Sequence, residues 1–88
     1  MKRKVLYGKQ ALKECRRLPS GLKTRIDEAV TRLADDPRPH GSIKLVDAKP
    51  DTWRLRVGDW RITYQIDDAS EAIVIMHINH RREVYRRM

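Results

Sequence analysis

The sequence predicts a single α+β domain over residues 1–88, with two N-terminal helices packed on one face of a twisted, mainly antiparallel sheet of four to five strands. Three observations predict this fold. Apolar residues recur at helical spacing in the first third of the chain. From Thr52 onward they alternate with polar residues, which is the period of a β-strand. A chain of 88 residues can build one modest core, so a second domain is not expected.

The first half of the chain predicts a short strand followed by a helical hairpin. The strand covers residues 4–7, and a first helix covers residues 9–18, where the apolar positions share helical spacing: Ala11, Leu12, Cys15 and Leu18. Pro19 ends this helix, and Ser20 is the expected N-cap of the second helix. The second helix ends near residues 35–37 and is expected to bury one apolar stripe: Leu22, Ile26, Ala29, Val30 and Leu33.

The second half predicts the rest of the sheet and a basic tail. The expected strands cover residues 43–45, 52–57, 60–66 and 72–78. Gly58 and Asp59 separate two alternating runs and predict a two-residue hairpin turn. Residues 72–78 are apolar at both odd and even positions, so this strand is expected to lie centrally and to be covered on both faces. Residues 79–88 have room for a short C-terminal helical tail.

The charge balance points to a polyanionic partner. Twenty Lys and Arg residues against twelve Asp and Glu residues give a net charge of +8, which favours binding to nucleic acid or to an acidic protein. The single cysteine, Cys15, allows no internal disulfide and fits a reducing cytoplasm. No apolar run approaches the roughly 20 residues of a membrane-spanning helix, so a cytoplasmic protein without a membrane partner is expected.

The charge is most informative in the predicted hairpin. A two-residue turn sets Arg56 opposite Arg61, on the face away from the core. Arg54 and Thr63 share that face, whereas the core face carries the apolar side chains Trp53, Leu55, Val57, Trp60, Ile62 and Tyr64. Like charges directly opposite each other on antiparallel strands are destabilising. The arginine pair therefore favours an anion site, because a planar guanidinium can hold two phosphate oxygens.

The tail adds further side chains that suit phosphate chemistry: His80, Arg81, Arg82 and Tyr85. If the last strand lies beside the hairpin, its exit delivers them to one end of the arginine-bearing face. Arginine, histidine and tyrosine together can stabilise charge on a phosphate, move protons near neutral pH and stack on a base. Two structural alternatives stay open. Asp51 or Glu83 neutralises the arginine pair, or the tail is simply solvated and Tyr85 anchors it.

The remaining candidates point to structure rather than to chemistry. His40 lies in a loop, His77 lies inside a strand pattern where core packing is expected, and Cys15 lies on the buried side of a helix. No pair of His or Cys residues has metal-ligand spacing, and there is no glycine-rich phosphate loop. Neither a metal nor another cofactor is expected.

Several segments of the chain resemble the RelE/ParE family of toxins, over nearly the whole length. The resembling segments are Ala11–Glu14, Leu33–Pro37, Trp53–Tyr64 and His80–Tyr85. The resemblance implies a compact sheet with two helices and an antitoxin protein as partner. In the RelE-like branch, which the tail favours, it implies cleavage of mRNA in the ribosomal A site. There the 2′-hydroxyl attacks the adjacent phosphate without a metal, leaving a 2′,3′-cyclic phosphate and a 5′-hydroxyl.

The resemblance also implies roles for individual residues. Arg61 and Arg81 are expected to stabilise charge on the scissile phosphate, and Tyr85 is expected to stack on a base or orient it. Arg54 and Arg56 fall where RelE-like enzymes often carry lysines, one of which is a candidate general base. These two arginines are expected to bind RNA phosphates instead, and Arg82 is grouped with them.

The identity of the general base stays open at this point. Arginine is a poor base at neutral pH because it keeps its proton. Either the base is dispensable, or His80 supplies it, since histidine changes its protonation state close to neutral pH. Two other functions also stay open. One is a ParE-like toxin that poisons DNA gyrase and cleaves no RNA, and the other is a non-catalytic binding module of the same fold.

Overall fold

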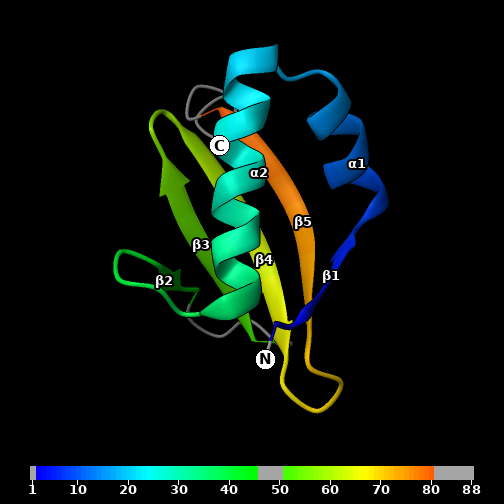
Figure 1. Ribbon diagram of the computed structural model, residues 1–88, viewed down its shortest axis with the longest axis vertical. Coiled ribbons are helices and arrows are strands. Elements are labelled where there is room, and N and C mark those ends of the chain that lie inside the picture. Colours follow the sequence, from blue (N-terminus) through cyan, green and yellow to red (C-terminus); the bar gives the residue numbers. More distant parts are fainter. Residues whose placement is uncertain (1, 46–50, 81–88) are drawn as a thin grey trace.

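The computed structural model describes residues 2–45 and 51–80, which form two helices and one five-stranded sheet. The elements are β1 (Lys4–Tyr7), α1 (Lys9–Arg16), α2 (Ser20–Asp35), β2 (Ile43–Lys44), β3 (Thr52–Val57), β4 (Trp60–Asp67) and β5 (Ala72–His80). The strand order is β1-β5-β4-β3-β2. Only the β1–β5 pair is parallel; the other pairs are antiparallel. The predicted α+β fold with a mainly antiparallel sheet is confirmed, and Figure 1 shows α2 lying across one face of that sheet.

The β3–β4 hairpin has the register that the sequence predicts. Val57 lies opposite Trp60, and Trp53 lies opposite Tyr64. Gly58 has a φ of +60°, whereas Asp59 is not among the described residues with positive φ. A positive φ at the first turn residue alone is the pattern of a type II′ turn, which glycine adopts without steric cost. The turn therefore fixes which side chains of both strands face the helices.

A single apolar core joins the helices to the sheet. Its buried side chains come from both helices, the connection between them, β4 and β5: Ala11, Leu18, Ile26, Ala29, Val30, Leu33, Ile62, Tyr64, Ile66, Ile73, Ile75 and Ile78. The predicted core face of the hairpin is confirmed, because Trp53, Leu55, Val57 and Trp60 pack against this cluster. The arginines that alternate with these residues consequently point away from the helical layer.

The ends of the helices differ from the prediction in two places. Pro19 rather than Ser20 occupies the N-cap of α2, and its carbonyl accepts the Lys23 N–H at 2.9 Å. Pro19 has a φ of −57° and a ψ of 146°, a non-helical backbone that suits this position, so Ser20 already belongs to the helix. Leu12, one of the apolar positions at helical spacing in the predicted first helix, is 43% exposed. The short helix α1 has Ala11 as its buried residue, and Leu12 lies about 100° further around the helix axis.

The coverage of β5 also differs from the prediction. β4, not β5, is the middle strand. Ile73, Ile75 and Ile78 are fully buried, but Val74 and Met76 on the other face are only partly buried. The two helices contribute their buried residues to the first of these faces. In β5, apolar residues at both odd and even positions therefore belong to a strand that has neighbouring strands on both sides but is covered by helices on one face only.

The loop after α2 is tied to the sheet by a charged cluster. The Arg38 guanidinium donates to Asp51 at 2.8 Å and to Asp68 at 3.1 Å, and Trp53 Nε1 donates to Asp51 at 2.9 Å. Burial raises the pKa of Asp51, but the hydrogen bonds from Arg38 and Trp53 outweigh it and leave that pKa below its ordinary value. Asp51 is thus engaged by Arg38, not by the hairpin arginines as one alternative held. Glu83 lies outside the described residues.

Tyr64 makes a second connection to the same loop. Its side chain is fully buried, and its hydroxyl donates to the Pro37 carbonyl at 2.7 Å. Burial raises the pKa of Tyr64 to about 12. The phenol therefore stays neutral across the physiological range. Among the described residues, no helix has the length and apolar character of a membrane span.

Candidate nucleic-acid interface

The outer side of the β3–β4 hairpin carries the basic side chains that the sequence predicts there. We call this surface the arginine face: Arg54, Arg56, Arg61 and Thr63. Arg56 lies directly opposite Arg61, and Arg54 lies opposite Thr63. Because β3 and β4 are adjacent strands, the Cβ atoms of all three arginines point to one side of the sheet. This is the side away from α2 (Figure 1).

Two of the arginines on this face, Arg54 and Arg56, have no compensating carboxylate within ion-pair distance among the described residues. Arg56 is exposed, and its Nε donates to the Gly58 carbonyl of the turn at 2.9 Å. That bond directs the Arg56 side chain toward the turn. Planar cations arranged in this way can bind phosphate oxygens bidentately.

His80 does not lie where the sequence predicts it. It is opposite Trp60 in the sheet, and the two rings meet edge to face with centroids 5.3 Å apart. Residues directly opposite each other on neighbouring strands share a face, and Trp60 belongs to the core side. The His80 ring therefore lies on the helix side of the sheet, not at the end of the arginine face.

His77, which the sequence suggested for core packing, lies on the arginine-bearing side instead. It is opposite Thr63, and Asn79 is opposite Arg61. The alternation along β5 slips at Met76, because the pairing of β4 with β5 shifts register between Thr63 and Tyr64. Such a bulge places one extra residue in the strand and re-aims the side chains after it. Sequence periodicity gave no sign of this slip.

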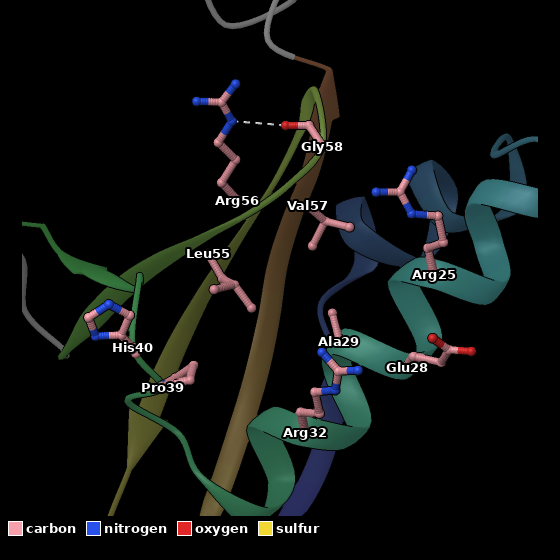
Figure 2. A pocket seen from close by; sticks show the side chains of 10 residues that line it. All are labelled: Arg25, Glu28, Ala29, Arg32, Pro39, His40, Leu55, Arg56, Val57 and Gly58. Atoms are coloured by element: carbon pink, nitrogen blue, oxygen red, sulfur yellow. Dashed lines mark hydrogen bonds between the residues drawn. The ribbon is translucent and has the colours of Figure 1, made fainter.

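A second basic surface lies on the helix side of the sheet. A groove of about 440 Å³ runs between α2 and β3 (Figure 2). Its basic lining residues are Arg25, Arg32, His40 and Arg56, and its apolar floor is Ala29, Leu55 and Val57. Figure 2 shows Leu55 and Val57 pointing toward α2, whereas Glu28 points away from the groove.

Sequence reasoning missed this groove, although one signal was present. Arg25 and Arg32 are seven residues apart, which places them on one side of a helix. The apolar floor and basic rim suit an acidic amphipathic partner.

The C-terminal candidates cannot be placed. Arg81, Arg82 and Tyr85 lie outside the described residues, so their roles stay predictions. Within the described part of the chain, no three His, Cys, Asp or Glu side chains gather as metal ligands do.

Comparisons with known proteins identify the family. Residues 5–85 match the family described as the ParE toxin of the type II toxin–antitoxin system parDE. Toxin RelG of Mycobacterium tuberculosis is 42% identical over 36 residues, and the match spans 41% of this chain and 41% of RelG.

Solved structures share the whole fold. The archaeal RelE–RelB complex of Pyrococcus horikoshii contains a chain that superposes with a TM-score of 0.81 at 29% identity, over 92% of this chain and 97% of that one. A mutant of the E. coli toxin RelE, in complex with an antitoxin RelBc peptide, superposes with a TM-score of 0.76 at 25% identity, over 99% and 94%. The family match covers nearly all of the chain, so this protein belongs to the ParE toxins of type II toxin–antitoxin systems, within the RelE/ParE superfamily.

Proposed function

We propose that this toxin is a ribosome-dependent endoribonuclease that cleaves mRNA in the ribosomal A site. The observation that carries the proposal is the arginine face, where Arg54, Arg56 and Arg61 project together from adjacent strands. Like charges opposed in this way destabilise a hairpin, and a bound anion relieves that repulsion. A phosphate chain is the anion that several guanidinium groups in a row suit best.

The reaction follows from what arginines can do. Charge builds up on the phosphate oxygens as the 2′-hydroxyl attacks, and fixed cations that meet this charge lower the barrier. Arg61 supplies such a cation from the sheet, and Arg81 supplies a second. Tyr85 stacks on a base, while Arg54, Arg56 and Arg82 hold neighbouring phosphates. No cofactor takes part in the proposed step.

The proposed protein partner is a cognate antitoxin. The relatives from P. horikoshii and E. coli were solved in complex with antitoxin proteins or peptides. The net charge of +8 and the basic groove between α2 and β3 favour an acidic or amphipathic segment of that antitoxin. Such a segment neutralises the toxin by covering its basic surfaces or by displacing the C-terminal tail.

A second candidate function is poisoning of DNA gyrase without RNA cleavage. The description of the matching family as ParE favours it, because the resemblance to ParE-like toxins implies that target. In that case the arginine face contacts protein or DNA, and Tyr85 has no chemical role.

Induced expression in cells separates the two functions. Mapping of mRNA 5′ ends is expected to show new ends inside translated codons, which depend on translation. Intact mRNA together with double-strand DNA breaks and a DNA-damage response would reject the ribonuclease and support gyrase poisoning. Normal growth with neither effect would indicate a non-catalytic binding module.

A further inference from the structure

We propose that His77, oriented by Glu14, is the group that accepts the 2′-hydroxyl proton during RNA cleavage. The inference rests on the proposed ribonuclease function and names the base that the arginine face itself lacks. Three observations support it: the position of the His77 ring, the buried Glu14 carboxylate near Nδ1, and the exposure of the rest of the ring to solvent.

The sheet places His77 beside the predicted phosphate site. His77 lies opposite Thr63 of the arginine face, and the adjacent pair on the same side is Asn79 with Arg61. His77 and Arg61 are therefore diagonal neighbours on two hydrogen-bonded strands, a relation in which long side chains reach each other. A phosphate held by Arg61 brings its ribose within reach of this part of β5.

Glu14 approaches His77 from the edge of the sheet. β1 pairs with β5 as far as Ile75, and α1 lies beside the second half of β5 (Figure 1). The Glu14 carboxylate accepts the Ile78 N–H at 3.0 Å and the Asn79 Nδ2 at 2.6 Å. The Glu14 side chain is 12% exposed. Two hydrogen bonds and burial hold this carboxylate in one orientation.

The fixed carboxylate faces one nitrogen of the imidazole. His77 Nδ1 lies 3.7 Å from a Glu14 oxygen. Nδ1 is buried and has no hydrogen-bond partner among the described residues, although the His77 side chain as a whole is 40% exposed. The exposed part of the ring is therefore its remaining edge, to which Nε2 belongs.

This arrangement selects the tautomer that a base requires. A carboxylate on the Nδ1 side favours the proton on Nδ1, which leaves the Nε2 lone pair free toward solvent. Among the charged groups of the described residues, Glu14 on α1 lies closest to the imidazole, and Arg61 on β4 is its diagonal neighbour in the sheet. Glu14 supplies a negative charge beside the imidazolium that forms on proton transfer.

The proposed step conserves atoms and charge. His77 Nε2 takes the 2′-hydroxyl proton, and the 2′-oxygen forms a bond to the adjacent phosphorus. The bond from phosphorus to the 5′-oxygen of the next nucleotide breaks, and that oxygen takes a proton from water. The products are a 2′,3′-cyclic phosphate and a 5′-hydroxyl, and solvent later removes the proton from the imidazolium. Glu14 is a positioning residue in this scheme.

Three matched histidine variants test the proposal on programmed ribosomes with the full-length toxin. His77→Gln, His80→Gln and His40→Gln remove one imidazole each, from the arginine-bearing side, the Trp60 side and the α2 groove respectively. Single-turnover cleavage is measured from pH 5 to 8. We expect His77→Gln to cleave about a hundredfold more slowly and to lose the acid limb of the pH profile. His80→Gln and His40→Gln are each expected to keep the acid limb.

Glu14→Gln supplies the second measurement. If Glu14 only supports the fold, the folded fraction of Glu14→Gln should show a pH profile of the same shape as the wild type. A positioning Glu14 moves the acid limb to lower pH, because the imidazolium loses its counter-charge, and lowers kcat with little effect on KM. Thermal melting of each variant reports folding independently of cleavage.

The outcomes separate this inference from the proposed function. Wild-type toxin that leaves mRNA intact on ribosomes overturns the ribonuclease and the inference with it. A second outcome is that the wild type cleaves mRNA and a folded His77→Gln variant cleaves within threefold of it, with the acid limb intact. This result overturns the role of His77 and leaves the ribonuclease function standing. Loss of the limb in His80→Gln instead transfers the role to His80.

Discussion

Arg56 and Arg61 place two like charges directly opposite each other on neighbouring strands. Such a pair costs a few tenths of a kcal/mol to about 1 kcal/mol in an antiparallel ladder. The Arg56 side chain reduces the conflict by bonding to the Gly58 carbonyl. At the scale of single residues, this pair sets two guanidinium groups on opposing strands, where a bound anion would relieve their repulsion.

Alanine variants of this surface are expected to separate activity from stability. Arg54→Ala and Arg61→Ala should each lower mRNA cleavage at least about tenfold, since one lost transition-state contact is worth about 1.4 kcal/mol or more. Arg56→Ala should keep its free energy of unfolding within about 0.5 kcal/mol of the wild type, because relief of repulsion offsets the lost hydrogen bond.

Arg16→Ala is the matched control, since Arg16 is an exposed arginine on α1. It should cleave like the wild type. Equal loss of cleavage in Arg16→Ala and Arg61→Ala would mean that net charge matters and that position does not. Urea titration measures stability, and primer extension on ribosome-bound mRNA measures cleavage.

At the scale of elements, the β3–β4 hairpin depends on one glycine. Gly58 has a φ of +60°, and a Cβ at this position would also meet the Arg25 guanidinium of α2 at 3.3 Å. Gly58→Ala is expected to destabilise the fold by about 1–2 kcal/mol, the cost of a left-handed backbone for an L-residue. Gly21→Ala is the control, because its Cβ meets nothing within 4 Å and α2 favours alanine.

Gly21→Ala should therefore be neutral or stabilise by up to about 1 kcal/mol. Chemical denaturation of both variants measures the difference in free energy of unfolding. A Gly58→Ala variant as stable as Gly21→Ala would show that the turn adopts another conformation in solution.

The contact between β4 and the loop after α2 has a signature at high pH. Tyr64 donates to the Pro37 carbonyl, and Tyr64→Phe should lower stability at neutral pH by about 1–2 kcal/mol because the carbonyl loses its partner. Burial raises the pKa of Tyr64 from 10.0 to about 12 in the folded protein. Between these two values, the unfolded chain loses the phenol proton and the folded chain keeps it.

The wild type therefore loses stability as the pH rises through this window. Tyr64→Phe lacks that contribution, so the gap between the two proteins should narrow above pH 10. Denaturation midpoints measured between neutral pH and pH 11 test this expectation. A gap that stays constant would mean that Tyr64 is accessible to water in the native state.

Elements also show what the sequence could and could not predict. Alternation in β3 and β4 predicted the register and both faces correctly, because a two-residue turn leaves one pairing that buries Trp53, Leu55 and Val57. The same reasoning failed for β5. One extra residue near Met76 reverses the faces after it, so that His77 points outward and His80 lies against Trp60. A bulge of this kind depends on strand pairing, which periodicity within one strand does not contain.

At the scale of the whole molecule, two basic surfaces lie on opposite sides of the sheet. The arginine face lies on one side of the sheet, and the groove lined by Arg25, Arg32 and His40 lies on the other. Arg56 lines the groove from the end of β3 and connects the two surfaces. An elongated anionic partner can therefore contact both by passing around the hairpin.

Association with the antitoxin is expected to be fast and sensitive to salt. A positive surface steers an acidic partner at long range, and the screening length falls from about 10 Å to about 3 Å between 0.1 M and 1 M salt. The association rate constant should fall at least about tenfold over that range, while the dissociation rate changes less. Stopped-flow mixing measures both rates. An association rate independent of salt would indicate an interface dominated by apolar contacts.

The contact between Glu14 and the edge of β5 has a consequence for solubility. A sheet edge with free backbone groups is a template on which another chain can add a strand, and long runs of such additions produce aggregates. β1 stops at Tyr7, and beyond it the Ile78 N–H bonds to a carboxylate instead of to backbone. A carboxylate offers no N–H to a further strand, so the ladder ends there. At the opposite edge, β2 has two residues, too few to hold an added strand in register. The carboxylate at the β5 margin and the short strand at the other edge thus both disfavour strand addition by a second chain before any antitoxin arrives.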